Sequence, residues 1–399
     1  MNEMKLMIFA AILGAALLSG CGTVQNTTPC PLAPAEATAG WDVRKLDEAF
    51  RFACKLGTTT LIVAADGEVV RSMGDVAVPR RVHSVRKALL SALIGQHIGS
   101  GSKQINLERT LVELGIDDEP HPLNELQKTA KVLHLIRSVS GINHAAAAEG
   151  GLMQKDKDRR LGQAPNIPGT KWAYNNWDYN ALTSIFIQET GLGVFKAFKE
   201  GIADPLGMED FGGNAVSLEY ERALSMHPKA GFALSARDLL KVGQLYLNKG
   251  DWQGRKIIPA SWVERITQDY TPTGRSGLRS AHGYLWWVPV DEKSRSMGVP
   301  AGTYMAAGFA GQRLVVIPAW NTVIVHQVDT GPFFECCRKL IGEKGYSFKD
   351  AVVDLFVNCR YLGALSGRLC RECGWAFNFL EGESFALIFF KILEARTNR

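Results

Sequence analysis

The sequence predicts an α/β fold in which strands from the two ends of the chain share one sheet and a mostly helical domain is inserted between them. Strand and turn patterns occur early, at residues 59–71, and again late, at residues 312–328. Between residues 100 and 269 the patterns are helical or loop-like, with few strand signals. At 399 residues and 46% hydrophobic, the chain is long enough for one large domain or two closely packed ones.

Residues 1–20 are predicted to be a targeting segment rather than part of this fold. Lys5 precedes an apolar run at 6–18 that is too short to span a bilayer as a mature helix. The run ends in Leu-Ser-Gly directly before Cys21, which resembles the lipobox of bacterial lipoproteins, where the cysteine is lipidated. Because Glu3 offsets the charge of Lys5, a plain secretory signal cleaved nearby is the alternative.

The lipoprotein interpretation predicts an exported protein anchored to a membrane by its N-terminus. Gly22, rather than an aspartate, follows the cysteine. In Gram-negative lipoproteins this usually permits export to the outer membrane, so we expect a protein that faces the periplasm. Residues 21–41, which are rich in Thr, Pro and Ala, would then be a flexible tether.

The first part of the sheet domain is predicted at residues 42–99. It opens with a helical stripe of apolar residues at 42–56, and a strand follows at 59–64. Asp66 and Gly67 are a tight-turn signal, after which residues 68–71 return as the hairpin partner. A second helix begins at Ser84.

Ser84 opens an apolar helix, and Lys87 lies one turn below it. Residues three apart share a helical face, so the ammonium can reach the hydroxyl. Burial in the apolar run 88–98 would lower the proton affinity of the lysine, which suits a base beside a nucleophile. The alternative is an ordinary helix start with a solvated lysine. The same spacing at residues 100–103 lies in a Gly/Ser loop and is interpreted as coincidence.

Residues 100–274 are predicted to form the helical domain, and the sheet resumes over residues 275–330. The helices are expected at 107–114, 128–137, 178–189, 194–202 and 235–247, the last capped by Ser235. The late strands are expected at 283–288, 312–317 and 322–328. A final segment, 385–399, supplies a last helix at 385–396.

Three motifs follow one another along the chain: Ser84-x-x-Lys87, Tyr174-Asn175-Asn176 and Gly308-Phe309-Ala310-Gly311-Gln312. In this order they resemble the serine β-lactamase and penicillin-binding-protein superfamily. The similarity is closest to the class C-like branch, which includes esterases and D-amino-acid peptidases, and it covers roughly residues 43–330. It implies a β-lactamase/transpeptidase-like fold, with an antiparallel sheet flanked by N- and C-terminal helices. It also implies a cofactor-free serine hydrolase that forms an acyl-enzyme.

The resemblance assigns a role to the tyrosine motif. Tyr174 would lie across the cleft from Ser84, where its phenol, kept partly ionised by Lys87, takes the serine proton and returns it to the leaving group. Asn176 would donate hydrogen bonds to Lys87 and to a substrate carbonyl.

Tyr174, Tyr246 and His83 each have an interpretation as a structural residue instead of a catalytic one. Tyr174 is alternatively a loop aromatic packed against Trp172 and Trp177. A second Tyr-x-Asn, at residues 246–248, lies in a helical pattern and is interpreted as core. His83, beside the nucleophile, is interpreted as a structural residue that faces away from substrate.

The resemblance places the oxyanion hole at the late motif, where the backbone N–H groups of Gln312 and Ser84 would hold the developing negative charge. Gly311 would let substrate lie against the strand edge. Phe309 stands where penicillin-recognising relatives carry a lysine or histidine that meets the substrate carboxylate. This departure favours an ester or small amide as substrate. A β-lactamase or a D-alanyl or D-amino-acid peptidase is the alternative, and a catalytically silent lipoprotein that binds a cell-wall peptide is the alternative from another class.

Residues 331–384 depart from the family and hold five of the eight cysteines. In an exported protein we expect disulfides, and five cysteines leave one unpaired unless Cys30 or Cys54 joins them. Zinc or redox chemistry at the Cys-x-x-Cys of residues 370–373 is the alternative, but no histidine has metal-ligand spacing, so we predict no metal.

The formal charge is +5, without a basic run interleaved with aromatics, which predicts no nucleic-acid partner.

Overall fold

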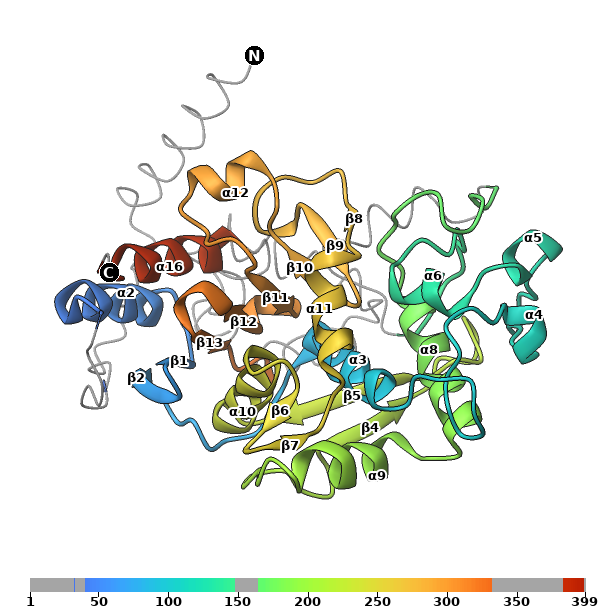
Figure 1. Cartoon of the computed structure of the whole chain (residues 1–399), viewed down its shortest axis with the longest axis horizontal. Coiled ribbons are helices and arrows are strands. Elements are labelled where there is room, and N and C mark those ends of the chain that lie inside the picture. Colours follow the sequence, from blue (N-terminus) through green and yellow to red (C-terminus); the bar gives the residue numbers. More distant parts are fainter. Residues whose placement is uncertain (1–31, 33–39, 148–163, 332–382, 398–399) are drawn as a thin grey trace, which may run out of the picture.

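The computed structural model describes residues 32, 40–147, 164–331 and 383–397. At its centre is an eight-stranded sheet, in the order β2-β1-β13-β12-β11-β10-β9-β8, whose neighbouring strands pair antiparallel (Figure 1). The predicted antiparallel sheet, assembled from both ends of the chain, is therefore confirmed. The strands are β1 (Thr60–Ala65), β2 (Glu68–Met73), β8 (Thr271–Pro272), β9 (Ala281–Gly283), β10 (Trp286–Val288), β11 (Tyr304–Ala307), β12 (Arg313–Ile317) and β13 (Thr322–Gln327).

Both faces of this sheet are covered, because successive side chains of its central strands point to opposite sides. On one face α2 (Val43–Lys55) and α16 (Glu383–Glu394) lie side by side and pack on Val315 and Ile324. The other face, with Leu314, Val323 and Val325, packs against α3 (Arg86–Gln96) and α10 (Ala236–Leu247). The predicted first and last helices are thus confirmed.

The helical region lies beside the sheet, at the right in Figure 1. Its longest helix, α8, begins immediately after Tyr174 and Asn175. The elements of this region and of the connections are α4 (Leu111–Leu114), α5 (Glu125–Lys128), α6 (Val132–Ile136), α8 (Asn176–Thr190), α9 (Val194–Phe198), η2 (Lys199–Ala203), α11 (Ala260–Gln268), α12 (Glu292–Ser296), η1 (His83–Val85), η3 (Gly277–Arg279), η4 (Phe309–Gly311) and η5 (Pro318–Trp320).

The region predicted to be helical also contains strands that the sequence analysis missed. A three-stranded sheet of order β3-β5-β4 joins β3 (Arg80–Arg81), β4 (Val216–Glu219) and β5 (Lys229–Leu234), and β6 (Asp251–Trp252) pairs with β7 (Arg255–Lys256). These strands are short, and β5 is mostly buried, so they lack a clear alternating pattern. The proposed division at residue 99/100 and residue 274/275 stays a prediction.

Two late strands differ from the expected boundaries. The single strand expected at 283–288 is a hairpin of β9 and β10, turned at Tyr284 and Leu285, which both have positive φ (50° and 74°). Neither residue is a usual turn former, so the sequence carries no signal for this turn. Strand β12 begins at Arg313, and Gln312 lies in the preceding turn instead of opening the strand.

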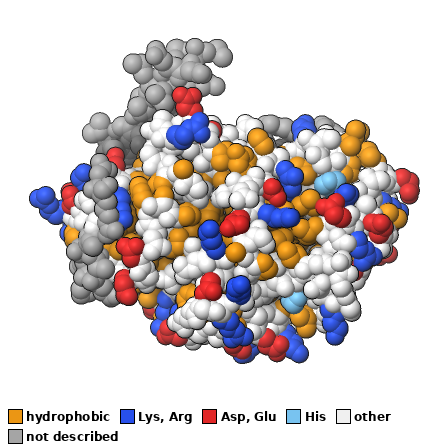
Figure 2. All heavy atoms as spheres, in the orientation of Figure 1, with side chains coloured by type: hydrophobic (Ala, Val, Ile, Leu, Met, Phe, Trp, Pro, Cys, Tyr) orange, Lys and Arg blue, Asp and Glu red, His pale blue; other side chains and the backbone are white. Residues whose placement is uncertain are grey.

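Several predictions fall on segments outside the described residues: the signal at 1–20, Cys21, nearly all of the tether, and the cysteine-rich segment. Cys54, at the end of α2, is disulfide-bonded. No helix in the described parts of the chain is both long and apolar enough to cross a bilayer. Acidic and basic side chains are interspersed on the face shown in Figure 2.

Helix α10 lies directly on the sheet at Gly243, which suggests a test of the packing. A Cβ at this position would lie 2.8 Å from Cδ1 of Leu314 and still closer to Val323. We expect Gly243→Val to lower the free energy of unfolding by about 1–3 kcal/mol through overpacking, as measured by urea denaturation. Gly213→Ala is the control, because nothing lies within 4 Å of its Cβ position. Equal stability of the two variants would contradict this packing.

Candidate active site

Ser84 lies in the short 3-10 turn η1 that leads directly into α3. Every residue of α3 from Arg86 to Gly95 is buried, because the helix is enclosed by apolar neighbours on all sides. Ser84 itself is partly exposed. The residue before it, His83, has a left-handed backbone (φ 49°), an uncommon conformation for a non-glycine residue. The turn therefore presents the serine at the accessible end of a rigid, buried helix.

Three side chains from separate parts of the chain meet at this hydroxyl. Lys87 Nζ donates to Ser84 Oγ at 2.7 Å, and the Tyr174 hydroxyl donates to the same oxygen at 3.0 Å. Lys87 Nζ also donates a short hydrogen bond to the Tyr174 hydroxyl. The side chains thus form a closed triangle of hydrogen bonds, which brings together the serine, lysine and tyrosine that the sequence analysis singled out.

Burial sets the protonation of this triangle. Desolvation, followed by the positive charges of Arg86 and Lys229, holds the pKa of the Lys87 ammonium well below its usual value. Burial raises the pKa of the Tyr174 phenol, and the hydrogen bond with Ser84 offsets only part of that rise. The expectation of a partly ionised phenol is therefore wrong in direction. The amine is the group that gives up its proton more readily, and the phenol stays protonated.

Aromatic rings enclose the lysine and hold the tyrosine in place. Lys87 Nζ lies 4.5 Å and 4.6 Å from the ring centroids of Tyr174 and Tyr179. The Tyr174 ring is stacked on Trp287 at a centroid distance of 6.0 Å and an interplanar angle of 9°. Tyr179 is fixed in turn by a 2.8 Å hydrogen bond between its hydroxyl and Ser138 Oγ. The alternative interpretation of Tyr174, packing between Trp172 and Trp177, does not account for these contacts.

Asn175, not Asn176, organises the start of α8. Its side-chain oxygen accepts from the N–H of Trp177 at 3.2 Å and caps the helix, and its Nδ2 donates to the Ile142 carbonyl at 2.8 Å. Lys87 Nζ donates to Ser84 Oγ and to the Tyr174 hydroxyl. The expected contacts of Asn176 with Lys87 and with substrate stay predictions.

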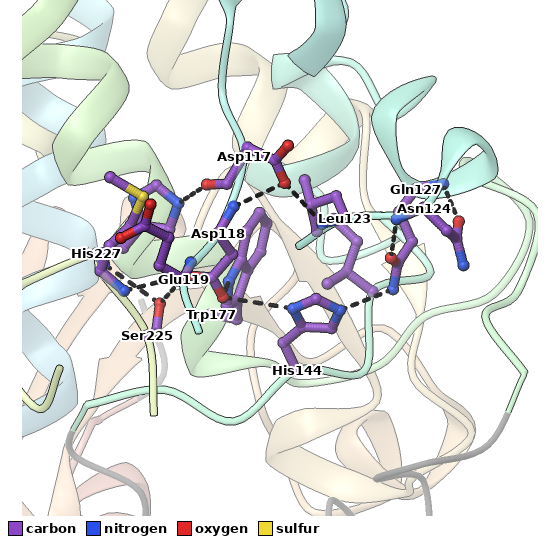
Figure 3. Close-up of polar contacts among 12 residues, drawn as sticks. Asp117, Asp118, Glu119, Leu123, Asn124, Gln127, His144, Trp177, Ser225 and His227 are labelled. Atoms are coloured by element: carbon purple, nitrogen blue, oxygen red, sulfur yellow. Dashed lines mark hydrogen bonds and ion pairs between the residues drawn. The ribbon is translucent and has the colours of Figure 1, made fainter. Parts of the chain in front are cut away.

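Behind this helix start lies a buried polar network centred on Asp118, shown in Figure 3. Its Oδ2 accepts from Trp177 Nε1 at 2.6 Å and is 3.3 Å from His144 Nδ1. Its Oδ1 accepts from Ser225 Oγ at 2.8 Å, from Met226 N at 3.0 Å and from the N–H of the next residue at 2.9 Å. The carboxylate therefore ties the first turn of α8, and with it the Tyr174 segment, to three other parts of the chain.

The pKa of Asp118 follows from the same contacts. Burial alone would raise the pKa of this carboxyl, but the hydrogen bonds from His144, Met226, Ser225 and Trp177 outweigh it, so the pKa lies below its usual value. The carboxylate is held in its charged form by its donors.

The glycine-containing turn after β11 approaches the nucleophile through Gly308. A Cβ on Gly308 would lie 3.2 Å from the backbone N of Ser84, so only glycine lets the two segments come this close. In contrast, the N–H of Gln312 points to the Phe309 carbonyl at 3.5 Å within its own turn, and its side chain donates to the Val328 carbonyl. Gly311, with φ 90°, shapes this turn, and its carbonyl is 2.6 Å from His326 Nδ1.

Phe309 and His83 pack against each other beside the site. Their rings meet edge to face at 5.6 Å, and His83 Nε2 is 2.9 Å from Thr330 Oγ1. Burial, with the charges of Lys229 and Arg81, lowers the pKa of His83 to about 3, so the ring is neutral at physiological pH. These contacts agree with the structural interpretation of His83.

The duplicate motifs are placed as expected. Lys103 is exposed in a loop with a left-handed backbone (φ 61°), and Tyr246 is buried in α10, where its hydroxyl donates to the Ala88 carbonyl at 3.2 Å.

A groove of about 700 Å³ opens elsewhere, beside Trp320 and Phe390, and contains none of the three side chains of the triangle. Among the described residues, no group of three His, Cys, Asp or Glu is arranged to hold a metal ion.

The fold and the hydrogen-bonded triangle are those of a serine hydrolase. The chain belongs to the beta-lactamase family, whose model matches residues 43–332.

Individual relatives are distant. An uncharacterised protein of Alkalihalophilus pseudofirmus is 26% identical over 221 residues, which cover 51% of this chain and 62% of that protein, less than two thirds of its length. A penicillin-binding protein homologue from Caulobacter crescentus superposes with a TM-score of 0.52 at 15% identity, over 75% of this chain and 94% of that one. EstCE1, a hydrolase with promiscuous acyltransferase activity, gives 0.52 at 14% identity, over 72% and 93%. At these identities the solved structures show the fold alone.

Sequence reasoning missed several residues around the triangle: Tyr179, Trp287, Asp118 and Gly308 in its close-approach role. Tyr179 follows Tyr174 by five positions on or near α8, which is a weak signal for a second ring beside the lysine. Trp287 and Asp118 come from segments that carry no motif. Gly308 opens the late motif, but its close approach to Ser84 has no sequence signal, so only the tertiary structure identifies these three roles.

The Asp118 network yields a stability prediction. We expect Asp118→Asn to lower the free energy of unfolding at pH 7 by roughly 2–4 kcal/mol, because it leaves buried donors without a charged acceptor. A pKa below its unfolded value means that the carboxylate stabilises the fold above about pH 4 and that this contribution is lost as the pH falls further. Denaturant titrations at several pH values should show the difference between wild type and variant shrinking below that pH.

Asp204→Asn provides the control, because Asp204 is exposed and pairs with Lys199 at the surface. A gap between wild type and Asp118→Asn that stays constant down to pH 3 would contradict the assigned charge.

Proposed function

We propose that this protein is a serine hydrolase that forms an acyl-enzyme at Ser84 and hydrolyses an ester or small amide. The observation that supports it most directly is the closed triangle of hydrogen bonds among Ser84, Lys87 and Tyr174. A serine alone is a weak nucleophile, and a neighbouring base within hydrogen-bond reach is what activates it.

The protonation of the triangle suggests how the steps divide. Lys87, whose pKa burial lowers, takes the Ser84 proton as the hydroxyl oxygen attacks the substrate carbonyl. The Tyr174 phenol is hydrogen-bonded to both that oxygen and the amine, so it gives its proton to the leaving group as the bond to the leaving group breaks and recovers a proton from the Lys87 ammonium. Water then attacks the acyl-enzyme carbonyl and gives its proton to the neutral amine. The bond between the carbonyl carbon and Oγ breaks, the acid product leaves, and the amine returns the proton to Ser84 Oγ.

The negative charge that develops during this attack requires nearby N–H donors. Gly308 lies close to both Ser84 and Gln312, since a Cβ on Gly308 would lie 3.2 Å from Ser84 N and 2.9 Å from Gln312 Cβ. The Gly308 N–H itself donates to the Gln312 carbonyl at 2.8 Å. The proposed oxyanion site therefore lies between the Ser84 N–H and the turn at residues 308–312, with the Gln312 amide as its second donor.

Ester or small amide substrates are favoured over β-lactams by what Phe309 contacts. Its ring packs on His83 and brings neither a charge nor a hydrogen-bond donor to the site. A β-lactamase or D-amino-acid peptidase is the competing activity, and turnover of nitrocefin in preference to short-chain p-nitrophenyl esters would support it.

We further propose that the protein is an exported lipoprotein, anchored through Cys21 and facing the periplasm. The disulfide at Cys54 supports an oxidising compartment. Metabolic labelling with a fatty-acid analogue tests the anchor, since Cys21→Ser should abolish incorporation.

The acyl-enzyme is tested with a fluorophosphonate probe. We expect labelling of the wild-type protein, complete loss in Ser84→Ala, and no loss in Ser100→Ala, which alters the duplicate motif. Ester turnover should fall by about 10²–10⁴-fold in Tyr174→Phe, whereas Tyr220→Phe, at an exposed tyrosine, should match wild type. Wild-type protein that does not label would instead favour a catalytically silent binding protein.

The lysine makes a separate prediction about pH. Because only the neutral amine can accept the serine proton, kcat/KM should rise with pH through the pKa of Lys87 and then level off. Burial lowers that pKa, so the midpoint should lie well below the value of about 10.4 for a free lysine. An activity that rises only near pH 10 would show that Lys87 keeps its proton and is not the base.

A further inference from the structure

Arg279 is a half-buried cation close to the proposed active site, and none of the described residues pairs with its charge. It ends η3, and its Cζ lies 5.5 Å from the ring centroid of Trp287. Among the described residues its guanidinium makes no ion pair or hydrogen bond. Neighbouring arginines are engaged: Arg313 Nη1 donates to the carbonyls of Gly308 and Gln312, and Arg137 Nη2 donates to Thr271 Oγ1.

Partial burial removes some water from the guanidinium, and desolvated charges in proteins are normally paired. Burial lowers the pKa of Arg279, and the other groups that act on this pKa are Tyr174 and Arg275, neither of them a carboxylate. The face of Trp287 compensates only in part, since a cation–π contact stabilises by about 0.5–2 kcal/mol.

The aromatic stack connects Arg279 to the reacting groups. Trp287 contacts the guanidinium and is stacked on the ring of Tyr174, whose hydroxyl is 3.0 Å from Ser84 Oγ. The positive charge of Arg279 acts on the Tyr174 phenol in return. Two successive ring contacts therefore link the arginine to the tyrosine that hydrogen-bonds the serine.

Two other cations near the serine are engaged: Lys229 Nζ pairs with Glu219 at 2.7 Å, and Arg86 Nη2 donates to Asn180 Oδ1 at 2.8 Å. Phe309 provides no charge. In the part of the chain that the structure describes, Arg279 differs from both in that its guanidinium has no hydrogen-bond or ion-pair partner, and it contacts the aromatic stack that leads to Tyr174.

We propose that Arg279 binds a carboxylate of the substrate and determines specificity for carboxylate-bearing esters or amides. The inference rests on the proposed function. A guanidinium presents two parallel N–H donors that match the two oxygens of a carboxylate, and its planar face stacks on an aromatic ring while those donors stay in plane. The Cζ of Arg279 lies over the Trp287 ring at 5.5 Å, and the ligand carboxylate would supply the charged partner that none of the described residues provides.

The test compares anionic and neutral esters of matched shape. On the acyl side the pair is 4-nitrophenyl hydrogen adipate and 4-nitrophenyl hexanoate. On the leaving-group side it is 3-carboxyphenyl butyrate and the neutral 3-(methoxycarbonyl)phenyl butyrate. We expect wild type to prefer the anionic member of at least one pair. Arg279→Gln should raise KM for that ester roughly 10- to 100-fold, as expected for loss of hydrogen bonds to a charged group, and leave the neutral ester within about twofold.

Two further variants separate recognition from structural support. Arg279→Lys keeps the charge and should restore part of the preference, and Arg255→Gln, at an exposed arginine, should behave as wild type. Equal losses for neutral and anionic esters in Arg279→Gln would overturn the inference, because they would show that the arginine only supports Trp287 and Tyr174. No preference in wild type, or no change in the variant, would also overturn it.

The fluorophosphonate probe keeps this failure distinct from failure of the proposed function. Labelling at Ser84 without discrimination between the esters would overturn the role of Arg279 alone. Absence of labelling would overturn the serine-hydrolase proposal and the inference with it.

Discussion

The arrangement of this protein depends on a buried lysine amine that shares its hydrogen bonds with a serine hydroxyl and a tyrosine phenol. An ammonium in such surroundings is costly unless a carboxylate accompanies it, and among the described residues none does. Burial therefore lowers the pKa of Lys87 and raises the share of the neutral amine, which is the form that can accept a proton from Ser84.

The rest of the fold keeps three distant segments at hydrogen-bond distance. Helix α3 is enclosed on all sides and holds Ser84 and Lys87 as one rigid unit. Tyr174 comes from the helical region, and its segment is held by the Asn175 cap and by Trp177 bound to Asp118. The late strands bring Gly308 against the Ser84 amide. Each of these supports is a buried contact with little room to relax, so the three reacting side chains stay within hydrogen-bond distance of one another.

Aromatic residues have two functions here. Tyr174, Tyr179 and Trp287 exclude water from the lysine, which strengthens the electrostatic effects within the triangle. The same Trp287 extends the stack outward to Arg279. A dry, uncharged interior at the reacting atoms thus lies next to a cation at its edge, which is a suitable arrangement for a substrate with an apolar reactive centre and an anionic end.

Much of the architecture could be read from local pattern. The Ser-x-x-Lys spacing places both side chains on one helical face in any helix, and the strands β1, β12 and β13 appear where apolar patterns predict them, because these properties depend only on neighbours in sequence. The turn at Tyr284 and Leu285 and the strands of the helical region were missed, since they are stabilised by contacts with distant segments.

The sequence by itself determined which residues could react, because hydroxyl, amine and phenol are fixed by residue type and helical spacing. Only the tertiary structure decided which of them holds the proton, since desolvation depends on what encloses each group; it raised the pKa of Tyr174, contrary to the expectation. It likewise brought Gly308 against Ser84 and Arg279 beside Trp287, because close approach between distant segments leaves no trace in local periodicity.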